Sequence, residues 1–228
     1  MATAGNTTGL RVKGLSYRLG ERLLLDDVDL EIASGESVAV TGPSGSGKST
    51  LLTCIMGLIK PDAGSVHIQG QDLTALSSAQ LAKARRQHIG VVFQFGELLP
   101  ELTPVENVAL PVLLSGGDHR RAYRQAQDLL SELGVPHEGT PTGMLSGGER
   151  QRTAVARALI TDPHVLLADE PTGALDPQAR ETVADVLFDM SRRRGCALLV
   201  VTHDPAVAAR ADRALHLAAG TLRDGAHV

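Results

Sequence analysis

The sequence is poor in aromatic residues and cysteine, and it has no long apolar run. It contains no Trp, three Phe, two Tyr and two Cys. Cys54 and Cys196 fall inside a predicted helix and a predicted strand, so we expect buried core residues in a reducing compartment. No apolar run approaches the roughly 20 residues needed to cross a bilayer, and the polar segment Met1–Gly9 lacks the pattern of a signal peptide. We therefore expect a cytoplasmic location, where any membrane role depends on a partner.

The charge balance excludes another class of partner. Lys and Arg number 22 against 26 Asp and Glu, which gives a net charge of −4. Binding to nucleic acid needs a basic surface, so we expect no nucleic acid partner. A chain of 228 residues, 43% of them hydrophobic, can bury a full core in a single domain spanning 1–228.

A glycine-rich loop, GPSGSGKS at residues 42–49, is the first pattern that indicates chemistry. It follows a predicted buried strand, Ser37–Thr41, and precedes a predicted helix that starts at Lys48. Glycines let backbone N–H groups turn toward phosphate oxygens, and the helix N-terminus adds partial positive charge. We expect Lys48 to reach the outer phosphates of a nucleotide and the Ser49 hydroxyl to ligate Mg²⁺. The alternative, a merely flexible Gly/Ser loop, is disfavoured by the strand–loop–helix context.

Two acidic residues close a later apolar strand, Val165–Ala168. Asp169 is placed to hold Mg²⁺ through water, as the second half of the metal site. Glu170 follows it and is placed to polarise an attacking water. The alternative is a pair of solvated acids at a strand end, which the phosphate loop elsewhere in the chain disfavours.

A second glycine-rich helix entry lies between these two patterns. Ser146, Gly147 and Gly148 precede a predicted helix, Glu149–Ile160. Bare backbone amides and a hydroxyl at a helix N-terminus make a second anion site. Because one nucleotide does not need two such cradles from one subunit, we expect a head-to-tail pair in which each subunit closes the other's ATP site.

The remaining pattern predicts an α/β architecture. Short strands from about Leu10 to Val40, with Ser65–Ile68, are typical of an antiparallel layer. From about residue 94 to 157 the pattern is helical, and it includes a helix over Arg120–Leu133 that Gly134 ends. Thereafter strands and helices alternate, as in a parallel sheet covered by helices. The last predicted strand is Ala197–Val201, and no appended regulatory domain is expected after it.

These motifs, in this order, make the chain resemble the ATP-binding-cassette (ABC) family over nearly its whole length. Gly42–Ser49 resembles the family's Walker A motif, Val165–Asp169 its Walker B motif and Leu145–Gln151 its signature motif. The resemblance implies the ABC ATPase fold of the P-loop NTPases. This fold has a RecA-like parallel-sheet core with an antiparallel β subdomain (1–93 and 158–228) and an inserted α-helical subdomain (94–157).

The resemblance also implies roles for single residues. Glu170 matches the catalytic glutamate, and His203 the switch histidine that contacts the γ-phosphate. Gln94 matches the glutamine that reaches Mg²⁺ and senses the transport partner. Asp176 falls in the loop that bridges two subunits, and Tyr17 matches the aromatic residue that stacks on adenine. Asp176 is also expected to cap the helix that starts at Pro177.

Three groups of candidate site residues follow. The nucleotide-binding candidates are Tyr17, Gly42, Pro43, Ser44, Gly45, Ser46, Gly47, Lys48, Ser49, Thr50, Gln94, Ser146, Gly147, Gly148, Asp176 and His203. The catalytic candidates are Lys48, Gln94, Glu170 and His203, and the metal candidates are Ser49, Gln94 and Asp169. ATP and Mg²⁺ are the expected cofactors.

One stretch, Ile89–Pro111, narrows the resemblance to the ATPases of lipoprotein-release, macrolide-export and antimicrobial-peptide-resistance systems. Such a subunit dimerises on ATP and drives a separate membrane permease, on the inner face of the cell membrane. Phe95, Leu98, Leu99 and Leu102 crowd into a loop that either folds inward or covers the permease.

Two alternatives belong to other classes. A cassette ATPase of translation or DNA repair would show a second cassette, a long coiled-coil insertion or zinc-ligand cysteines, and the sequence shows none of these. An ATP-binding scaffold of a cell-envelope or cell-division complex, with little turnover, is disfavoured by Glu170 and His203.

Overall fold

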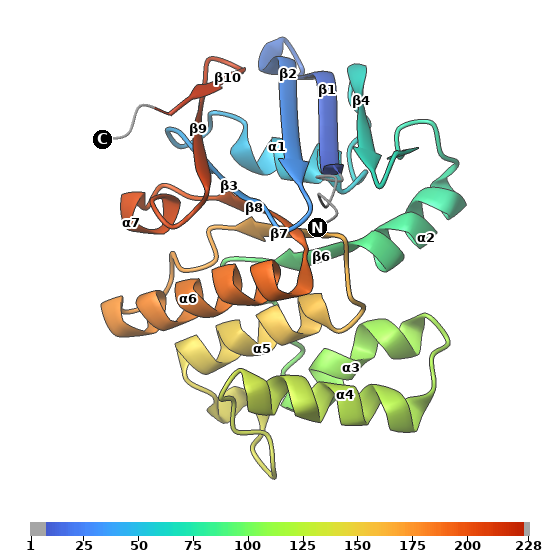
Figure 1. Cartoon of the computed structure of the whole chain (residues 1–228), viewed down its shortest axis with the longest axis vertical. Helices are drawn as coiled ribbons and strands as arrows, with labels where there is room; N and C mark the ends of the chain where they lie inside the picture. The colour runs from blue at the N-terminus through green and yellow to red at the C-terminus, as the bar shows by residue number, and fades with distance from the viewer. Residues whose placement is uncertain (1–7, 226–228) are drawn as a thin grey trace, which may run out of the picture.

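The computed structural model describes residues 8–225, in which two β-sheets are stacked and helices cover the second sheet (Figure 1). The first sheet is antiparallel, in the order β2-β1-β4-β5. Its strands are β1 (Thr8–Leu19), β2 (Arg22–Ala33), β4 (Ala63–Ile68) and β5 (Gln71–Asp72). Most of Met1–Gly9, on which the signal-peptide prediction rests, lies outside the described residues. The antiparallel layer is confirmed, but β1 and β2 have 12 residues each and are not short. The predicted layer also extends too far, because Ser37–Val40 lie in β3 (Ser37–Thr41), which pairs in parallel in the second sheet.

The second sheet has six strands in the order β10-β9-β3-β8-β7-β6. They are β3 (Ser37–Thr41), β6 (Ile89–Val92), β7 (Val165–Asp169), β8 (Ala197–Val201), β9 (Arg213–Ala218) and β10 (Thr221–Asp224). All neighbours pair in parallel except the β9–β10 hairpin. The near-continuous apolar runs of β7 and β8 explain their central places, because both faces of a parallel sheet are covered.

The helices flank this sheet on both faces. They are α1 (Lys48–Ile55), α2 (Ser78–His88), α3 (Pro104–Leu114), α4 (His119–Glu132), α5 (Gly147–Leu159), α6 (Pro177–Arg194) and α7 (Pro205–Ala208), with a 3₁₀ turn at Thr142–Met144. Figure 1 shows α1 between the two sheets, α5 and α6 below the six-stranded sheet, and α3 and α4 at the opposite end from β1 and β2. Within the described residues, no helix is long and apolar enough to cross a membrane.

Alternate residues of the central strands enter two different cores. Leu167 and Leu199 pack with α1 and the antiparallel sheet, whereas Leu166 and Leu198 pack with α3 to α6. Both cysteines are buried as expected, although Cys196 lies just before β8 and not inside a strand. Because β3, β8 and β7 run in parallel, the carboxyl ends of β3 and β7 lie at the same edge of the sheet, where the phosphate loop and the two acids are found.

Candidate nucleotide-binding and catalytic site

The phosphate loop joins β3 to α1, and its three glycines, Gly42, Gly45 and Gly47, all have a positive φ. Gly42 and Gly47 have φ of 148° and 107°, a backbone region that side chains disfavour. A Cβ on Gly42 would lie 2.3 Å from the Leu217 carbonyl oxygen, and a Cβ on Gly47 would lie 2.6 Å from that of Leu24. The loop is therefore packed against β9 and β2, which fixes the direction of its amides.

Lys48, at the start of α1, is buried beneath this loop. Its ammonium donates to the carbonyl oxygens of Gly42 (2.7 Å) and Pro43 (3.0 Å). An ammonium has three protons, so one donor is left for a ligand. The Ser46 hydroxyl is also buried in the loop, and within residues 8–225 it has no hydrogen-bond partner. Because buried polar groups are normally paired, an unpaired hydroxyl here fits a loop built to receive phosphate oxygens.

The loop forms one wall of a cleft of about 580 Å³. Three other segments complete the lining: the β1–β2 hairpin, the end of β7 and the residue that follows Thr202. The lining residues are Leu19, Arg22, Leu24, Ser44, Gly45, Gly47, Lys48, Ser49, Thr50, Asp169, Glu170 and His203. The structure thus brings the predicted residues of the phosphate loop, of the β7 end and His203 together from three distant parts of the sequence, but not Gln94.

Asp169 ends β7 opposite the first turn of α1. The Ser49 hydroxyl lies 3.4 Å from its carboxylate. Burial raises the pKa of Asp169, and the neighbouring Glu170 charge adds to this, while the Ser49 hydrogen bond and Lys48 act in the opposite direction. A carboxylate and a hydroxyl are ligands that suit Mg²⁺, so this pair can hold the predicted metal.

Glu170 and His203 contact each other directly. Glu170 Oε1 lies 2.8 Å from His203 Nδ1, and its Oε2 accepts from the Thr202 hydroxyl and the His203 amide at 3.3 Å each. The Glu170 side chain is 17% exposed and that of His203 is 70% exposed. Glu170 also has a φ of 46°, which is uncommon outside glycine. The acid is therefore held in one orientation, with the histidine at the solvent side of the cleft.

Gln94 lies beyond β6 and does not line this cleft. Its amide nitrogen is 2.9 Å from the place that a Cβ on Gly173 would occupy, three residues after Glu170. The loop that contains it is fastened to α5. Gln151 donates to the Phe93 carbonyl at 2.7 Å, and Arg157 donates to the carbonyls of residues 96 and 97 at 2.6 Å each. Sequence reasoning missed Arg157, although a charge inside an apolar helical stretch was the available signal.

Ser146 caps α5 and lies outside the cleft of its own chain. Its hydroxyl accepts from the Glu149 amide at 3.3 Å, and Glu149 accepts from the Ser146 amide at 2.7 Å. A Cβ on Gly147 or Gly148 would crowd the side chains of Leu175 and Ala179 at 3.3 and 3.1 Å. The residues predicted to form a second anion site thus lie at the N-terminus of α5, apart from the phosphate loop of the same chain.

Tyr17 and Asp176 are also placed by the structure. Tyr17 is partly buried against the first core, and the cleft wall from its hairpin is formed by Leu19, Arg22 and Leu24 instead. Sequence reasoning missed Arg22, whose guanidinium donates to the Gly45 carbonyl at 2.8 Å. Asp176 caps α6 as predicted, since it accepts from the Ala179 amide at 3.0 Å.

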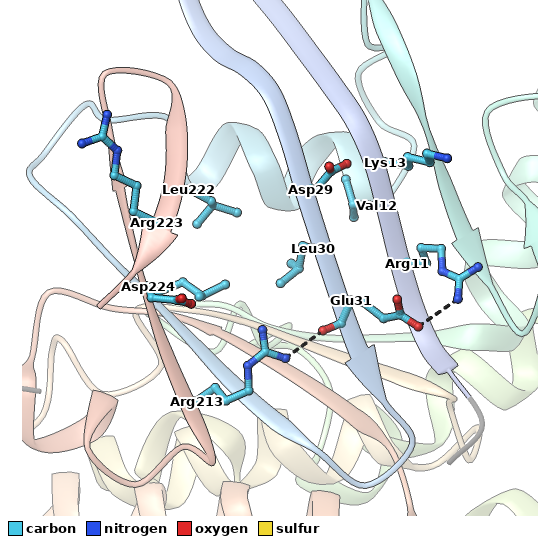
Figure 2. Close-up of a pocket in the computed structure, with 11 residues that line it drawn as sticks. Arg11, Val12, Lys13, Asp29, Leu30, Glu31, Arg213, Leu222, Arg223 and Asp224 are labelled. Atoms are coloured by element: carbon cyan, nitrogen blue, oxygen red, sulfur yellow. Dashed lines mark hydrogen bonds and ion pairs between the residues drawn. The ribbon is translucent and has the colours of Figure 1, made fainter. Parts of the chain in front are cut away.

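A larger groove, of about 650 Å³, lies between β2 and the β9–β10 hairpin (Figure 2). Its central charges already have partners. Arg11 pairs with Glu31 at 2.9 Å, and Arg213 donates to the Glu31 carbonyl at 3.2 Å and to Glu36 at 2.9 Å. The groove is lined by strand residues and lacks the glycine cradle of the phosphate loop, so the smaller cleft is the candidate site.

The fold and the cleft define a P-loop ATPase, and the Ser146 helix entry lies apart from the cleft of its own chain. The sequence profile of the ABC transporter family matches residues 25–173. The chain therefore belongs to the ABC transporter family, and it is an ATP-hydrolysing subunit.

Two relatives and one solved structure show how close the likeness is. The lipoprotein-releasing system ATP-binding protein LolD of Chromohalobacter salexigens is 44% identical, with 99% of this chain and 97% of that protein covered. LolD of Xanthomonas axonopodis pv. citri is 49% identical, with 88% of this chain and 83% of that protein covered. The ATP-binding cassette MJ0796, solved as a dimer in a post-hydrolysis state bound to ADP and Pi, is 36% identical, with a TM-score of 0.84 over 96% of this chain and 99% of that one.

Proposed function

We propose that this ATPase works as a Mg²⁺-dependent dimer on a separate membrane permease, at the inner face of the membrane, and drives the release of lipoproteins. The cargo class rests on the relatives that are named as parts of lipoprotein-releasing systems. The dimer is supported by one observation: the two elements predicted to bind the phosphates lie apart in a single chain. The Lys48 loop and the Ser146 helix entry both present backbone amides at a helix N-terminus, yet Ser146 does not line the cleft that holds Lys48.

Each ATP would then lie between two subunits. The phosphates are held by Lys48, Ser49 and the loop amides of one subunit, and Ser146 with its neighbouring amides approaches from the second. Ser146 and Glu149 already satisfy each other in the capping box, so the amides of Gly147 and Gly148 remain as the donors for a phosphate. When the interface closes, these amides donate hydrogen bonds to the γ-phosphate of ATP. Hydrolysis then removes the phosphate that holds them there.

Within one half of the site, Glu170 orients the attacking water and His203 binds the γ-phosphate end. Their 2.8 Å contact keeps the imidazole oriented and places the carboxylate oxygen beside it. Ser49 and Asp169 would hold Mg²⁺, with Gln94 as a further ligand, and the metal would neutralise developing charge on the phosphates. Gln94 reaches it only if its loop moves toward the cleft, because it does not line the cleft here.

A second cavity suits the permease. It has a volume of about 300 Å³ and lies between α2, β6 and α3. The apolar part of its lining includes Phe93, Leu110, Pro111 and Leu114, and Arg85 and Arg86 flank it. Such a groove can receive a short helix of the permease.

The loop after Gln94 follows Phe93, which lines this groove, but no residue of the loop itself is part of the lining. Leu98 packs against the second core, whereas Phe95 and Leu99 are 67% and 44% exposed. Leu98 is therefore folded inward, and we propose that the exposed Phe95 and Leu99 are the residues of this loop that face the permease. We further propose that 94–157 acts as a helical subdomain which carries the permease signal to the nucleotide.

The Glu170→Gln variant tests this function. The amide keeps the shape of the side chain and its bond to Thr202, but it cannot accept a proton. We expect ATP turnover to fall about 100-fold or more, while binding of a fluorescent ATP analogue stays within about twofold. The matched control is Glu181→Gln, an exposed acid on α6. Turnover within about threefold of wild type would show that Glu170 is not the base.

A further inference from the structure

Two exposed apolar side chains lie beside the two halves of the proposed composite site. Leu19, at the end of β1, is 64% exposed and lines the nucleotide cleft next to Arg22. Met144 is 77% exposed and stands two residues before Ser146. Single exposed apolar residues are normal on protein surfaces. These two are notable because each adjoins a segment that must meet ATP.

The backbone holds Met144 outward. The next residue, Leu145, is 2% exposed and packs in the second core. Met144 itself belongs to a 3₁₀ turn in which its amide donates to the Pro141 carbonyl at 3.0 Å. Consecutive Cα atoms are about 3.8 Å apart, so the Cα of Met144 lies within about 8 Å of that of Ser146. A surface that receives Ser146 therefore lies within reach of the Met144 side chain.

We propose that Met144 of one copy of this chain packs against Leu19 of a second copy when ATP closes the dimer. This inference rests on the head-to-tail dimer of the proposed function. Ser146 of the second copy must enter the cleft that Leu19 borders, and Met144 enters with it. A flexible thioether side chain fills irregular apolar gaps. By symmetry each closed dimer contains two such contacts, which stabilise the closed state and cover the rim of the cleft.

The second copy fits Leu19 better than the permease does. Leu19 shares the cleft with Lys48 and Glu170, whereas the groove proposed for the permease lies at α2, β6 and α3. The contact therefore continues the composite interface and needs no additional partner.

Cross-linking of single-cysteine copies tests the contact. One copy carries Leu19→Cys and the other Met144→Cys, both with Glu170→Gln so that ATP is not consumed. The native thiols interfere little, because burial raises the pKa of Cys54 and Cys196 to about 11. We expect a disulfide-linked heterodimer with ATP and Mg²⁺, and none with ADP. Leu58→Cys, another exposed apolar position at 56%, replaces Leu19→Cys as the control and should give no link.

The outcomes separate this inference from the function on which it rests. A dimer that sediments with ATP but forms no Leu19–Met144 link would overturn the contact and leave the composite site standing. If ATP binds and no dimer forms, the composite site and this contact both fail.

A charge at the contact gives an independent measurement. Met144→Glu should raise the dissociation constant of the ATP-bound Glu170→Gln dimer at least about tenfold, while Met144→Leu should leave it nearly unchanged. Met144 is exposed and not in the cleft of its own chain, so ATP binding by the monomer should survive. Leu58→Glu serves as the control. An unchanged dissociation constant for Met144→Glu would overturn the proposal.

Discussion

At the scale of single residues, several groups in or beside the cleft have an environment or a backbone conformation that destabilises the folded protein. Asp169 is half-buried with a raised pKa, Glu170 has a positive φ, and the Ser46 hydroxyl is buried without a partner in the described chain. Such features gather at functional sites, where binding of the ligand offsets their cost. Phosphate oxygens of ATP would pair with the Ser46 hydroxyl, and Mg²⁺ would offset the cost of the ionised Asp169 carboxylate.

Asp169→Asn should therefore stabilise the nucleotide-free protein at neutral pH. The pKa of Asp169 is raised in the folded state, so the ionised form destabilises the fold once the pH exceeds that value. The variant should therefore unfold at a higher Tm than the wild type when no nucleotide is bound. Thermal unfolding with and without Mg-ATP measures this, and the variant should lose most of the stabilisation by the metal-bound nucleotide.

The same substitution has a predictable pH dependence. As the pH falls through the folded-state pKa, wild-type Asp169 becomes protonated and neutral, like Asn. The Tm advantage of Asp169→Asn should then shrink between about pH 7 and about pH 4, a range that brackets ordinary carboxyl titration. An advantage that grows as the pH falls would contradict the raised pKa.

At the scale of elements, α5 connects the parts of the site. Its N-terminus carries Ser146, its sides pack on α3, α4 and α6, and Gln151 and Arg157 hold the loop that follows β6. A shift of α5 would therefore carry both Ser146 and the loop of Gln94 with it. We therefore propose α5 as the element through which the proposed permease groove and the nucleotide affect each other.

Arg157→Ala should loosen this connection. It removes the donors to two loop carbonyls, which we expect to cost about 2 kcal/mol, or a fall of about 5 °C in Tm. Permease stimulation of ATPase activity should fall more than basal activity does. Arg157→Lys keeps the charge but not the two-pronged geometry, so it should recover only part of the coupling. Full coupling in a folded Arg157→Ala protein would contradict the role.

Most elements could be predicted because their patterns are local. The helix predicted over 120–133 is α4 (His119–Glu132), which ends before Gly134 with a φ of 62°. The phosphate loop and the acids of β7 were predicted for the same reason. In contrast, α2, β9 and β10 were missed, since their residues are largely exposed or mixed in burial.

Contacts between distant residues could not be read from local patterns. The Glu170–His203 pair depends on the pairing of β7 with β8, and the Arg22–Gly45 contact depends on the stacking of two sheets. The opposite roles of Leu98 and Leu99 follow from how one irregular loop packs, which has no periodic signal. The chemistry was thus predictable at each motif, and the mutual geometry was not.

At the scale of the whole molecule, the permease groove and the nucleotide cleft lie on different parts of one chain. Leu114 is 72% exposed at the edge of the groove and far in sequence from the catalytic residues. Leu114→Glu should abolish the stimulation of ATPase activity by the permease, because it places a charge at an apolar contact. Basal activity should stay within about twofold, as should that of Leu58→Glu. Undiminished stimulation in the Leu114 variant would place the permease elsewhere.

The central claim is that ATP joins two copies of this chain through a shared site. The most direct measurement is the sedimentation mass of the Glu170→Gln variant with Mg-ATP, with Mg-ADP and without nucleotide. One chain has a mass of 23.9 kDa. We expect this mass without nucleotide and with ADP, and about twice this mass with ATP. A monomer mass at saturating ATP, in a variant shown to bind ATP, would contradict the central claim.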